Sequence, residues 1–197
     1  MKKRGLITGA LMLAVLCALT NCSKKTFELQ SRAFKGNERI PDRYCYGNTE
    51  PPEYQVVLSI EGRQNISPPF RWTNPPVDTQ SYALIIHDPE GRNWIHWAVF
   101  NIPANCNEIA ENASGNNMPE GSIELNNQFR TPGYGGPEPP RGSGTHGYIA
   151  TLYALNTPEI NGLDTYKSFA EINAILNGKI IAKAEIMGYY SVNGSEK

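Results

Sequence analysis

The chain has 197 residues and a formal net charge of −1, with 18 Lys and Arg residues against 19 Asp and Glu residues. This length suits one packed domain, and the balanced charge argues against recruitment to nucleic acid or to an acidic membrane surface by electrostatics alone. The 18 Gly and 15 Pro residues, with 10% aromatic residues, favour short strands and many turns over long helices. A β-dominated domain is therefore expected.

The N-terminus has the pattern of an export signal. A short cationic start, Met1–Arg4, precedes an almost wholly apolar run from Leu6 to Leu19. This run is too short and wrongly flanked for a permanent membrane-spanning helix, so it predicts a signal peptide over residues 1–21.

The apolar run ends just before Cys22, which resembles the lipobox of bacterial lipoproteins. We predict acylation of Cys22, a tether over residues 22–30 and a single domain over residues 31–197. Asn21 replaces the usual small residue, so cleavage by an ordinary signal peptidase nearby is the alternative. The resemblance to lipoproteins implies an exported protein anchored in the cell envelope, at the outer membrane or the periplasmic face.

Two cysteines remain after the predicted processing, Cys45 and Cys106. They could pair in an oxidising compartment, but the sequence gives no distance between them. Two buried free thiols are an equal alternative, so their pairing stays open.

Alternating apolar residues with β-branched and aromatic side chains predict several strands, each bounded by Pro, Gly or Asn. The proline-rich stretch 67–76 is expected to be an ordered connection, because proline removes a donor from a strand ladder. The polar stretch 112–130 has no period and predicts a surface loop of the kind that borders a binding site. The predicted strands are Tyr54–Ile60, Ser81–His87, Ile95–Asn101, Tyr148–Leu155 and Ile180–Tyr190.

One helix is predicted after these loops. Ser168 can cap its N-terminus, Glu171 completes a capping box, and Gly178 suits the C-terminal end. Its apolar stripe consists of Phe169, Ile172, Ile175 and Leu176.

The three histidines fall at strand ends or beside Gly- and Pro-rich loops, where a rigid scaffold presents functional groups. In the first cluster, His87–Arg92, a strand runs into a turn that leaves Asp88 at its mouth. In the second, a period of two puts Trp94 and His96 on one strand face and Trp97 on the other. The third, Gly133–Tyr148, is a stiff glycine- and proline-rich loop that ends in a histidine and a tyrosine sharing one strand face.

These clusters, in this order, resemble the phosphatidylethanolamine-binding family, which in bacteria is also called the Raf kinase inhibitor-like family. The resemblance covers about residues 34–192 and implies an antiparallel β-sandwich with one or two short helices and a pocket at the ends of the sheet. The segments that carry it are Ile40-Pro41, Ile66–Pro69, Asp88–Arg92, His96-Trp97, Asn101–Pro103, Gly133–Leu155 and Ala184–Tyr190.

The resemblance also implies a ligand pocket for a small anion such as a phosphate or a phospholipid head group. Imidazoles at two of its positions can donate N–H groups to phosphate oxygens, and a carboxylate can hold one imidazole in place. The implied pocket residues are Asp88, Trp94, His96, Pro139, Pro140, His146 and Tyr148.

Two segments depart from the family pattern. In the turn after Asp88, Glu90 replaces a second Asp and Gly91-Arg92 replaces Ala-Pro, and in the later loop Glu138 stands where bacterial relatives often carry Cys or Gly. A carboxylate at the lip of the pocket can repel phosphate, so Glu138 puts the choice of ligand in question but not the fold.

We expect a non-enzymatic binding module without a cofactor or metal, which accepts a small anionic ligand and can regulate or inhibit a partner protein. The alternative is a hydrolase that uses His96 or His146 as general base and Asp88 as orienter, with an activated nucleophile or a bound metal. Zinc or iron suits two histidines and a carboxylate, but no His-x-His spacing is present. His87 is expected to be structural.

Overall fold

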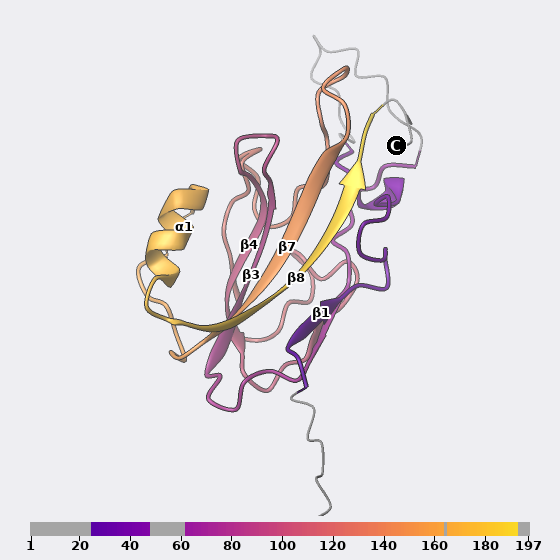
Figure 1. The fold of residues 1–197 in the computed structure, drawn as a ribbon. Helices are drawn as coiled ribbons and strands as arrows, with labels where there is room; N and C mark the ends of the chain where they lie inside the picture. Colours follow the sequence, from indigo (N-terminus) through magenta and orange to yellow (C-terminus); the bar gives the residue numbers. More distant parts are fainter. Residues whose placement is uncertain (1–24, 48–61, 164, 193–197) are drawn as a thin grey trace, which may run out of the picture.

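The computed structural model describes residues 25–47, 62–163 and 165–192 (Figure 1). Two antiparallel sheets and one α-helix make up the described part. A five-stranded sheet has the order β6-β4-β3-β7-β8, and a three-stranded sheet has the order β1-β2-β5. The strands are β1 (Glu28–Gln30), β2 (Phe70–Thr73), β3 (Ser81–Asp88), β4 (Trp94–Pro103), β5 (Glu108–Ile109), β6 (Ile123–Glu124), β7 (His146–Leu155) and β8 (Ile180–Tyr190); a 3-10 turn, η1 (Asp42–Tyr44), follows β1, and α1 (Phe169–Leu176) precedes β8.

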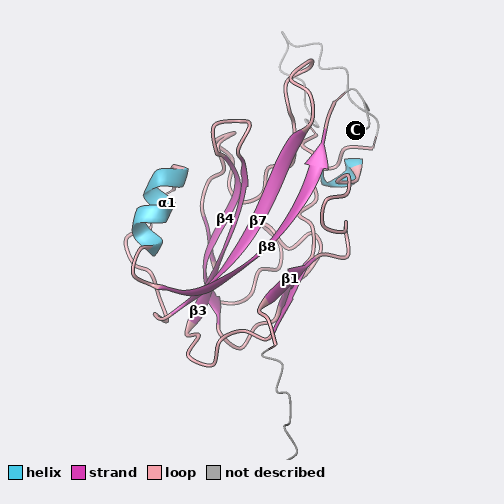
Figure 2. Ribbon diagram, in the orientation of Figure 1, coloured by secondary structure: helices cyan, strands magenta, loops and turns pink. Residues whose placement is uncertain are grey.

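The five-stranded sheet is covered on both faces, which confirms the mainly β sandwich expected from the sequence. Figure 2 shows α1 on one side of this sheet and β1 on the other. Between the sheets, Trp72 of β2 packs against Tyr82 of β3 with ring centroids 5.2 Å apart. On the other face, Ile172 and Leu176 of α1 are fully buried against the sheet. Burial of these apolar side chains stabilises the domain.

The central strands and the helix lie where the sequence predicts them. The predicted strands that begin at residues 81, 95, 148 and 180 correspond to β3, β4, β7 and β8, with shifts of one or two residues at some ends. The Ser168 hydroxyl accepts the Glu171 N–H, and the Glu171 carboxylate accepts the Ser168 N–H, so the capping box is present. Gly178 follows the helix with a φ of +74°.

The three-stranded sheet corrects two expectations. Residues 70–73, inside the proline-rich stretch, form β2, the central strand of that sheet. The prolines lie on either side of this four-residue segment, so its own N–H groups remain available for the ladder. Residues 28–30, which the sequence placed in the tether, form β1, because Leu29 is buried and pairs opposite Trp72.

Several other predictions meet the structure only in part. The stretch 112–130 is mostly turns, with the short strand β6 inside it. Cys45 is buried and Cys106 is half-buried, and both are free thiols.

The signal peptide, Cys22 and the predicted strand Tyr54–Ile60 lie outside the described residues. None of the described helices is long and apolar enough to cross a bilayer.

Candidate ligand-binding site

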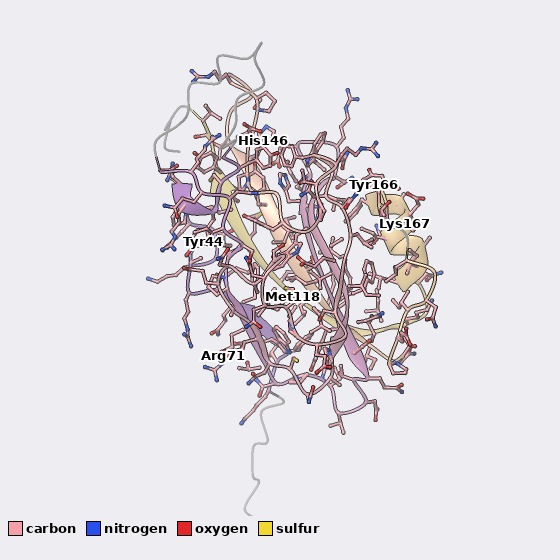
Figure 3. All side chains as sticks on the ribbon, turned by 180° about the vertical axis from the view of Figure 1, so that it is seen from behind. Tyr44, Arg71, Met118, His146, Tyr166 and Lys167 are labelled. Atoms are coloured by element: carbon pink, nitrogen blue, oxygen red, sulfur yellow. The ribbon has the colours of Figure 1, made fainter. Side chains whose placement is uncertain are left out.

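Four predicted site residues converge at one end of the five-stranded sheet. Asp88 ends β3, His96 lies near the start of β4, and His146 and Tyr148 lie at the start of β7. Figure 3 labels His146 at this end of the molecule. All four are buried, with exposed fractions between 2% and 6%. The sheet therefore gathers residues that are far apart in the sequence into one closed cluster.

Asp88 and His146 form the tightest contact of the cluster. The His146 Nδ1 lies 2.6 Å from the Asp88 Oδ2, and Asp88 Oδ1 accepts the Gly91 N–H at 2.8 Å. The second bond closes the turn after β3 and holds the carboxylate in place. Since the carboxylate occupies Nδ1 of the imidazole, the orientation of the ring is fixed and Nε2 is the nitrogen left for a ligand.

His96 is held in a different way. Its Nδ1 lies 2.6 Å from the Gly135 carbonyl oxygen, and the Gly135 N–H donates to the His96 carbonyl at 2.8 Å. A carbonyl only accepts, so Nδ1 carries the proton and Nε2 of the neutral ring carries a lone pair. Burial lowers the His96 pKa to about 4. Near neutral pH this imidazole therefore presents an acceptor at Nε2, not the N–H donor expected from the sequence.

A bulge in β4 explains where His96 points. Ile86 of β3 pairs with Trp97, but the next residue, His87, pairs with Ile95, so His96 has no partner on β3. The alternation of faces breaks at this position. Trp97 was expected on the opposite face from His96, but its ring packs 5.6 Å from that of Tyr134, which lines the same cavity as His96.

Two polar groups of the predicted site are buried without a hydrogen-bond partner among the described residues. They are the Tyr148 hydroxyl and the Trp94 Nε1–H. The Tyr148 ring lies against the His96 ring, with centroids 5.0 Å apart at 74°, and burial raises the Tyr148 pKa. An unpaired buried polar group costs stability, about 1–3 kcal/mol. Such groups gain a partner when a polar ligand binds.

The glycine- and proline-rich loop packs closely on the cluster. A Cβ at Gly136 would collide with the Tyr44 carbonyl, so this position requires glycine. Pro139 is buried in the loop, whereas Pro140 is exposed and accepts the Ser143 N–H at 3.0 Å in a turn. Pro139 is therefore buried, but the proline of this loop that lines the cavity with His96 and Tyr148 is Pro137, and Pro140 belongs to the exposed loop tip.

The cavity behind the cluster is small. His96 and Tyr148 line it together with apolar residues from the three-stranded sheet and the N-terminal segment, and its volume is about 10 Å3. This is close to the lower limit for one water molecule. A phosphate-sized ligand therefore binds only if side chains that contact the cluster move.

The sequence matches the phosphatidylethanolamine-binding protein family over residues 30–191. The chain belongs to this family. Proteins of this family are generally binding proteins, and the Asp88, His96 and His146 cluster lies within the matched range.

Similar proteins from bacteria and archaea support the same assignment. A UPF0098 protein of Methanothermobacter thermautotrophicus is 35% identical over 166 residues, which cover 82% of this chain and 97% of the relative. The UPF0098 protein YbcL of Escherichia coli is 36% identical over 172 residues, covering 84% of this chain and 88% of the relative.

Solved structures show the same fold. The crystal structure of E. coli YbcL, described as a member of the mammalian PEBP family, matches with a TM-score of 0.73 at 30% identity and covers 84% of this chain and 98% of that chain. A PEBP homologue from Chlamydia trachomatis matches with a TM-score of 0.66 at 27% identity, covering 84% of this chain and 97% of that chain.

The two carboxylates that depart from the family pattern have different neighbours. Glu90 accepts the Gly147 N–H at 3.1 Å and so ties the turn after β3 to the start of β7. Glu138 lies 3.8 Å from the guanidinium of Arg63. Glu90 therefore has a structural contact, whereas Glu138 faces a cation at the edge of the site.

Sequence reasoning missed Phe129, which contacts the site from the loop between β6 and β7. Its ring stacks on Tyr46 at 4.1 Å and meets the rings of Trp94 at 5.4 Å and His96 at 5.7 Å. The buried Asn127 side chain accepts the Phe129 N–H at 2.9 Å and fixes the turn. Phe129 is the only aromatic residue in the polar stretch 112–130, and that isolation was the available signal.

His87 lies on the other face of the sheet from the cluster. Its ring stacks on Phe169 of α1 with centroids 4.3 Å apart, and burial lowers its pKa. This placement agrees with the structural role expected for His87. Within the described part of the chain, no group of three His, Cys, Asp or Glu residues is arranged to hold a metal ion.

Proposed function

We propose that this chain is a non-enzymatic binding module that accepts a small phosphate-bearing ligand, such as a phospholipid head group, at the Asp88, His96, His146 and Tyr148 cluster. The observation that carries the proposal is the buried Tyr148 hydroxyl, which has no partner among the described residues and lies beside a neutral His96. The membership of a family of binding proteins supports it.

The polarity of the cluster supports a ligand with both donors and acceptors. Tyr148 and Trp94 have unused donor hydrogens, whereas Nε2 of His96 is an acceptor. Hydrogen phosphate offers oxygen acceptors and a P–OH donor, and an ethanolamine head group offers an ammonium donor. Sulfate offers acceptors alone. We therefore expect phosphate and phosphoethanolamine to bind better than sulfate, with modest affinity because few bonds offset the ordering cost.

An NMR titration of the histidine ring signals tests this function. Adding inorganic phosphate or phosphoethanolamine should shift the signals of His96 and His146 and leave His87, on the other sheet face, unchanged. Sulfate at the same concentration should produce smaller shifts. Unchanged His96 and His146 signals at high phosphate concentration would contradict the proposal.

The proposal extends to the site of action. The cationic start, the apolar run and Cys22 support export and a lipid anchor in the cell envelope, from which the domain can bind a lipid head group or regulate a partner protein. Metabolic labelling with a radioactive fatty acid should mark the full chain and fail to mark the Cys22→Ala variant. Equal labelling of both would contradict acylation at Cys22.

The Asp88–His146 contact also supports a hydrolase as the second candidate function, because a carboxylate that orients an imidazole is the arrangement of a general base. Such a mechanism requires a nucleophile or an activated water next to that imidazole. Release of nitrophenol from phosphate and carboxylate esters by wild type, and its loss in His146→Gln, would favour the hydrolase. Equal background release of nitrophenol by both proteins would contradict the hydrolase and favour the binding module.

A further inference from the structure

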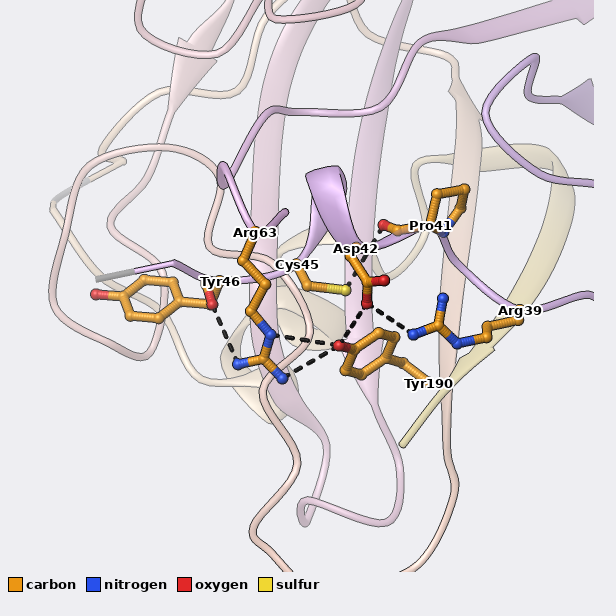
Figure 4. Close-up of polar contacts among 7 residues, drawn as sticks. All are labelled: Arg39, Pro41, Asp42, Cys45, Tyr46, Arg63 and Tyr190. Carbon is orange, nitrogen blue, oxygen red and sulfur yellow. Dashed lines mark hydrogen bonds and ion pairs between the residues drawn. The ribbon is translucent and has the colours of Figure 1, made fainter. Parts of the chain in front are cut away.

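Arg63 places a buried positive charge next to the candidate site, and nothing in the sequence pattern marked it. Its side chain is 7% exposed. Figure 4 shows its guanidinium between Tyr46 and Tyr190. Nε and one Nη donate to the Tyr190 hydroxyl at 3.3 and 3.2 Å, and the other Nη donates to the Tyr46 carbonyl at 3.3 Å. Both acceptors are neutral.

The carboxylates near Arg63 compensate its charge only in part. Asp42 binds Arg39 at 2.7 Å and accepts the Tyr190 O–H at 2.8 Å, so it is hydrogen-bonded to Arg63 only through the tyrosine (Figure 4), although the Arg63 charge helps to lower the Asp42 pKa. Glu138 lies 3.8 Å away, which exceeds the distance of about 2.7–2.9 Å found for a charge-assisted hydrogen bond. A buried guanidinium with so loose a counter-ion favours a closer anion.

Three contacts connect Arg63 with the candidate site. The Tyr46 residue that accepts its N–H stacks on Phe129, whose ring contacts that of His96. Tyr190 pairs with His146 across β7 and β8. Glu138 precedes Pro139 in the loop that packs on the cluster. Arg63 is therefore linked to the site through the half-buried residues Tyr46 and Phe129 and the buried Tyr190.

We propose that Arg63 is the cation that binds the anionic part of the ligand, and that Glu138 is an internal competitor that the ligand displaces from Arg63. This inference rests on the proposed binding function and assigns the charge recognition within it. The planar guanidinium can form two parallel bonds with phosphate oxygens. The displaced Glu138, one-third exposed, can turn to water or meet the ammonium group of a zwitterionic ligand.

The protonation behaviour of Glu138 is consistent with a loosely held carboxylate. Burial raises its pKa, and the nearby Arg63 opposes that change. A carboxylate locked in a tight ion pair would have its pKa lowered instead. Removing the Glu138 charge should therefore cost little stability while it leaves Arg63 without its competitor.

Isothermal titration calorimetry of the purified full chain with inorganic phosphate tests the inference, in wild type and in Glu138→Gln. The variant should bind phosphate about fivefold more tightly, since a partly exposed ion pair that competes with the ligand is worth about 1 kcal/mol. Glu185→Gln is the matched control: it removes one negative charge from an exposed pair with Lys183 on β8 and should change the affinity by less than about twofold. Arg63→Lys should weaken phosphate binding, because an ammonium cannot form the bidentate contact.

The outcomes separate this inference from the function on which it rests. If wild type binds phosphate but Glu138→Gln binds it equally or more weakly, Arg63 and Glu138 do not form the proposed switch, and the binding function stands. If neither wild type nor Glu138→Gln binds phosphate, both proposals fail. Should Arg63→Lys not fold, the comparison of Glu138→Gln with Glu185→Gln still decides the matter.

Discussion

The two ends of the five-stranded sheet differ in whether their buried polar groups have hydrogen-bond partners. At the end away from the site, the Ser81 hydroxyl donates to the Thr157 carbonyl at 2.6 Å, and the Asn101 side chain forms two bonds with the Ile160 backbone. At the site end, the Tyr148 hydroxyl and the Trp94 indole N–H are buried without partners among the described residues. We call the first the completed end because its Ser81 and Asn101 side chains are paired, although the indole N–H of Trp72, which packs on the neighbouring Tyr82, lacks a partner within the described part of the chain, as do His87 Nδ1 and Ser122 Oγ elsewhere. The site end has two such groups that a ligand can pair.

This difference separates residues that stabilise the fold from residues that bind. A change at the completed end should lower the free energy of unfolding and leave ligand affinity unchanged. At the site end, removing an unpaired polar group should lower ligand affinity and leave the free energy of unfolding unchanged or raise it, because such a group costs stability until a ligand pairs with it.

Asn101→Ala should destabilise the folded state by roughly 3–5 kcal/mol, because it leaves the buried Ile160 N–H and C=O without partners and forces alanine into a positive φ. In the structure these bonds are 2.8 and 3.2 Å long and the Asn101 φ is 56°. Urea denaturation measures the change. Asn101→Gly tolerates the φ and should recover about 1–2 kcal/mol of it. Equal free energies of unfolding for Asn101→Ala and wild type would contradict the proposed difference between the completed end and the site end of the sheet.

Protonation of His96, at the site end, should make the free energy of unfolding of the protein depend on pH. The folded-state pKa is about 4, whereas an unfolded histidine titrates near about 6.5. Between these values the unfolded state binds more protons, so stability falls as pH drops from about 6.5 to about 4, by about 3 kcal/mol. His96→Asn keeps a donor toward Gly135 and should lack this component. Urea denaturation of both proteins across that range measures the difference, and parallel curves would contradict a neutral buried His96.

Tyr148→Phe should separate binding from stability most sharply. The variant removes a hydroxyl that has no partner in the described structure, so the free energy of unfolding should stay the same or rise by about 1 kcal/mol. Phosphate affinity should fall by about tenfold or more, the effect of one hydrogen bond to a charged group, worth about 1.5–3 kcal/mol. Calorimetry and urea denaturation on the same preparation measure both quantities. A less stable Tyr148→Phe protein with unchanged phosphate affinity would make Tyr148 a core residue.

The regular parts of the fold could be predicted because local pattern and tertiary environment agree there. β8 is bounded by turn residues, and α1 carries a capping box that acts within one turn of chain. The small sheet could not be predicted as well. β2 has only four residues between prolines, and β1 has three, so neither contains enough alternation to show a period.

The candidate site was predictable as a set of residues but not in its geometry. The family resemblance brought Asp88, His96 and His146 together before their positions were known. The direction of His96 depends on a bulge, and a bulge adds one residue without a sequence signal of its own. Phe129 and Arg63 come from irregular segments that only the tertiary fold places beside the cluster.

A crystal of the protein soaked in phosphate would show whether the ligand occupies the site end of the sheet. We expect a phosphate with one oxygen within hydrogen-bond distance of the Tyr148 hydroxyl, next to Nε2 of His96, and with Phe129 displaced from its stack on Tyr46. A phosphate bound only elsewhere, or an unchanged closed cluster at a saturating concentration, would contradict the claim that this end of the sheet is completed by a ligand.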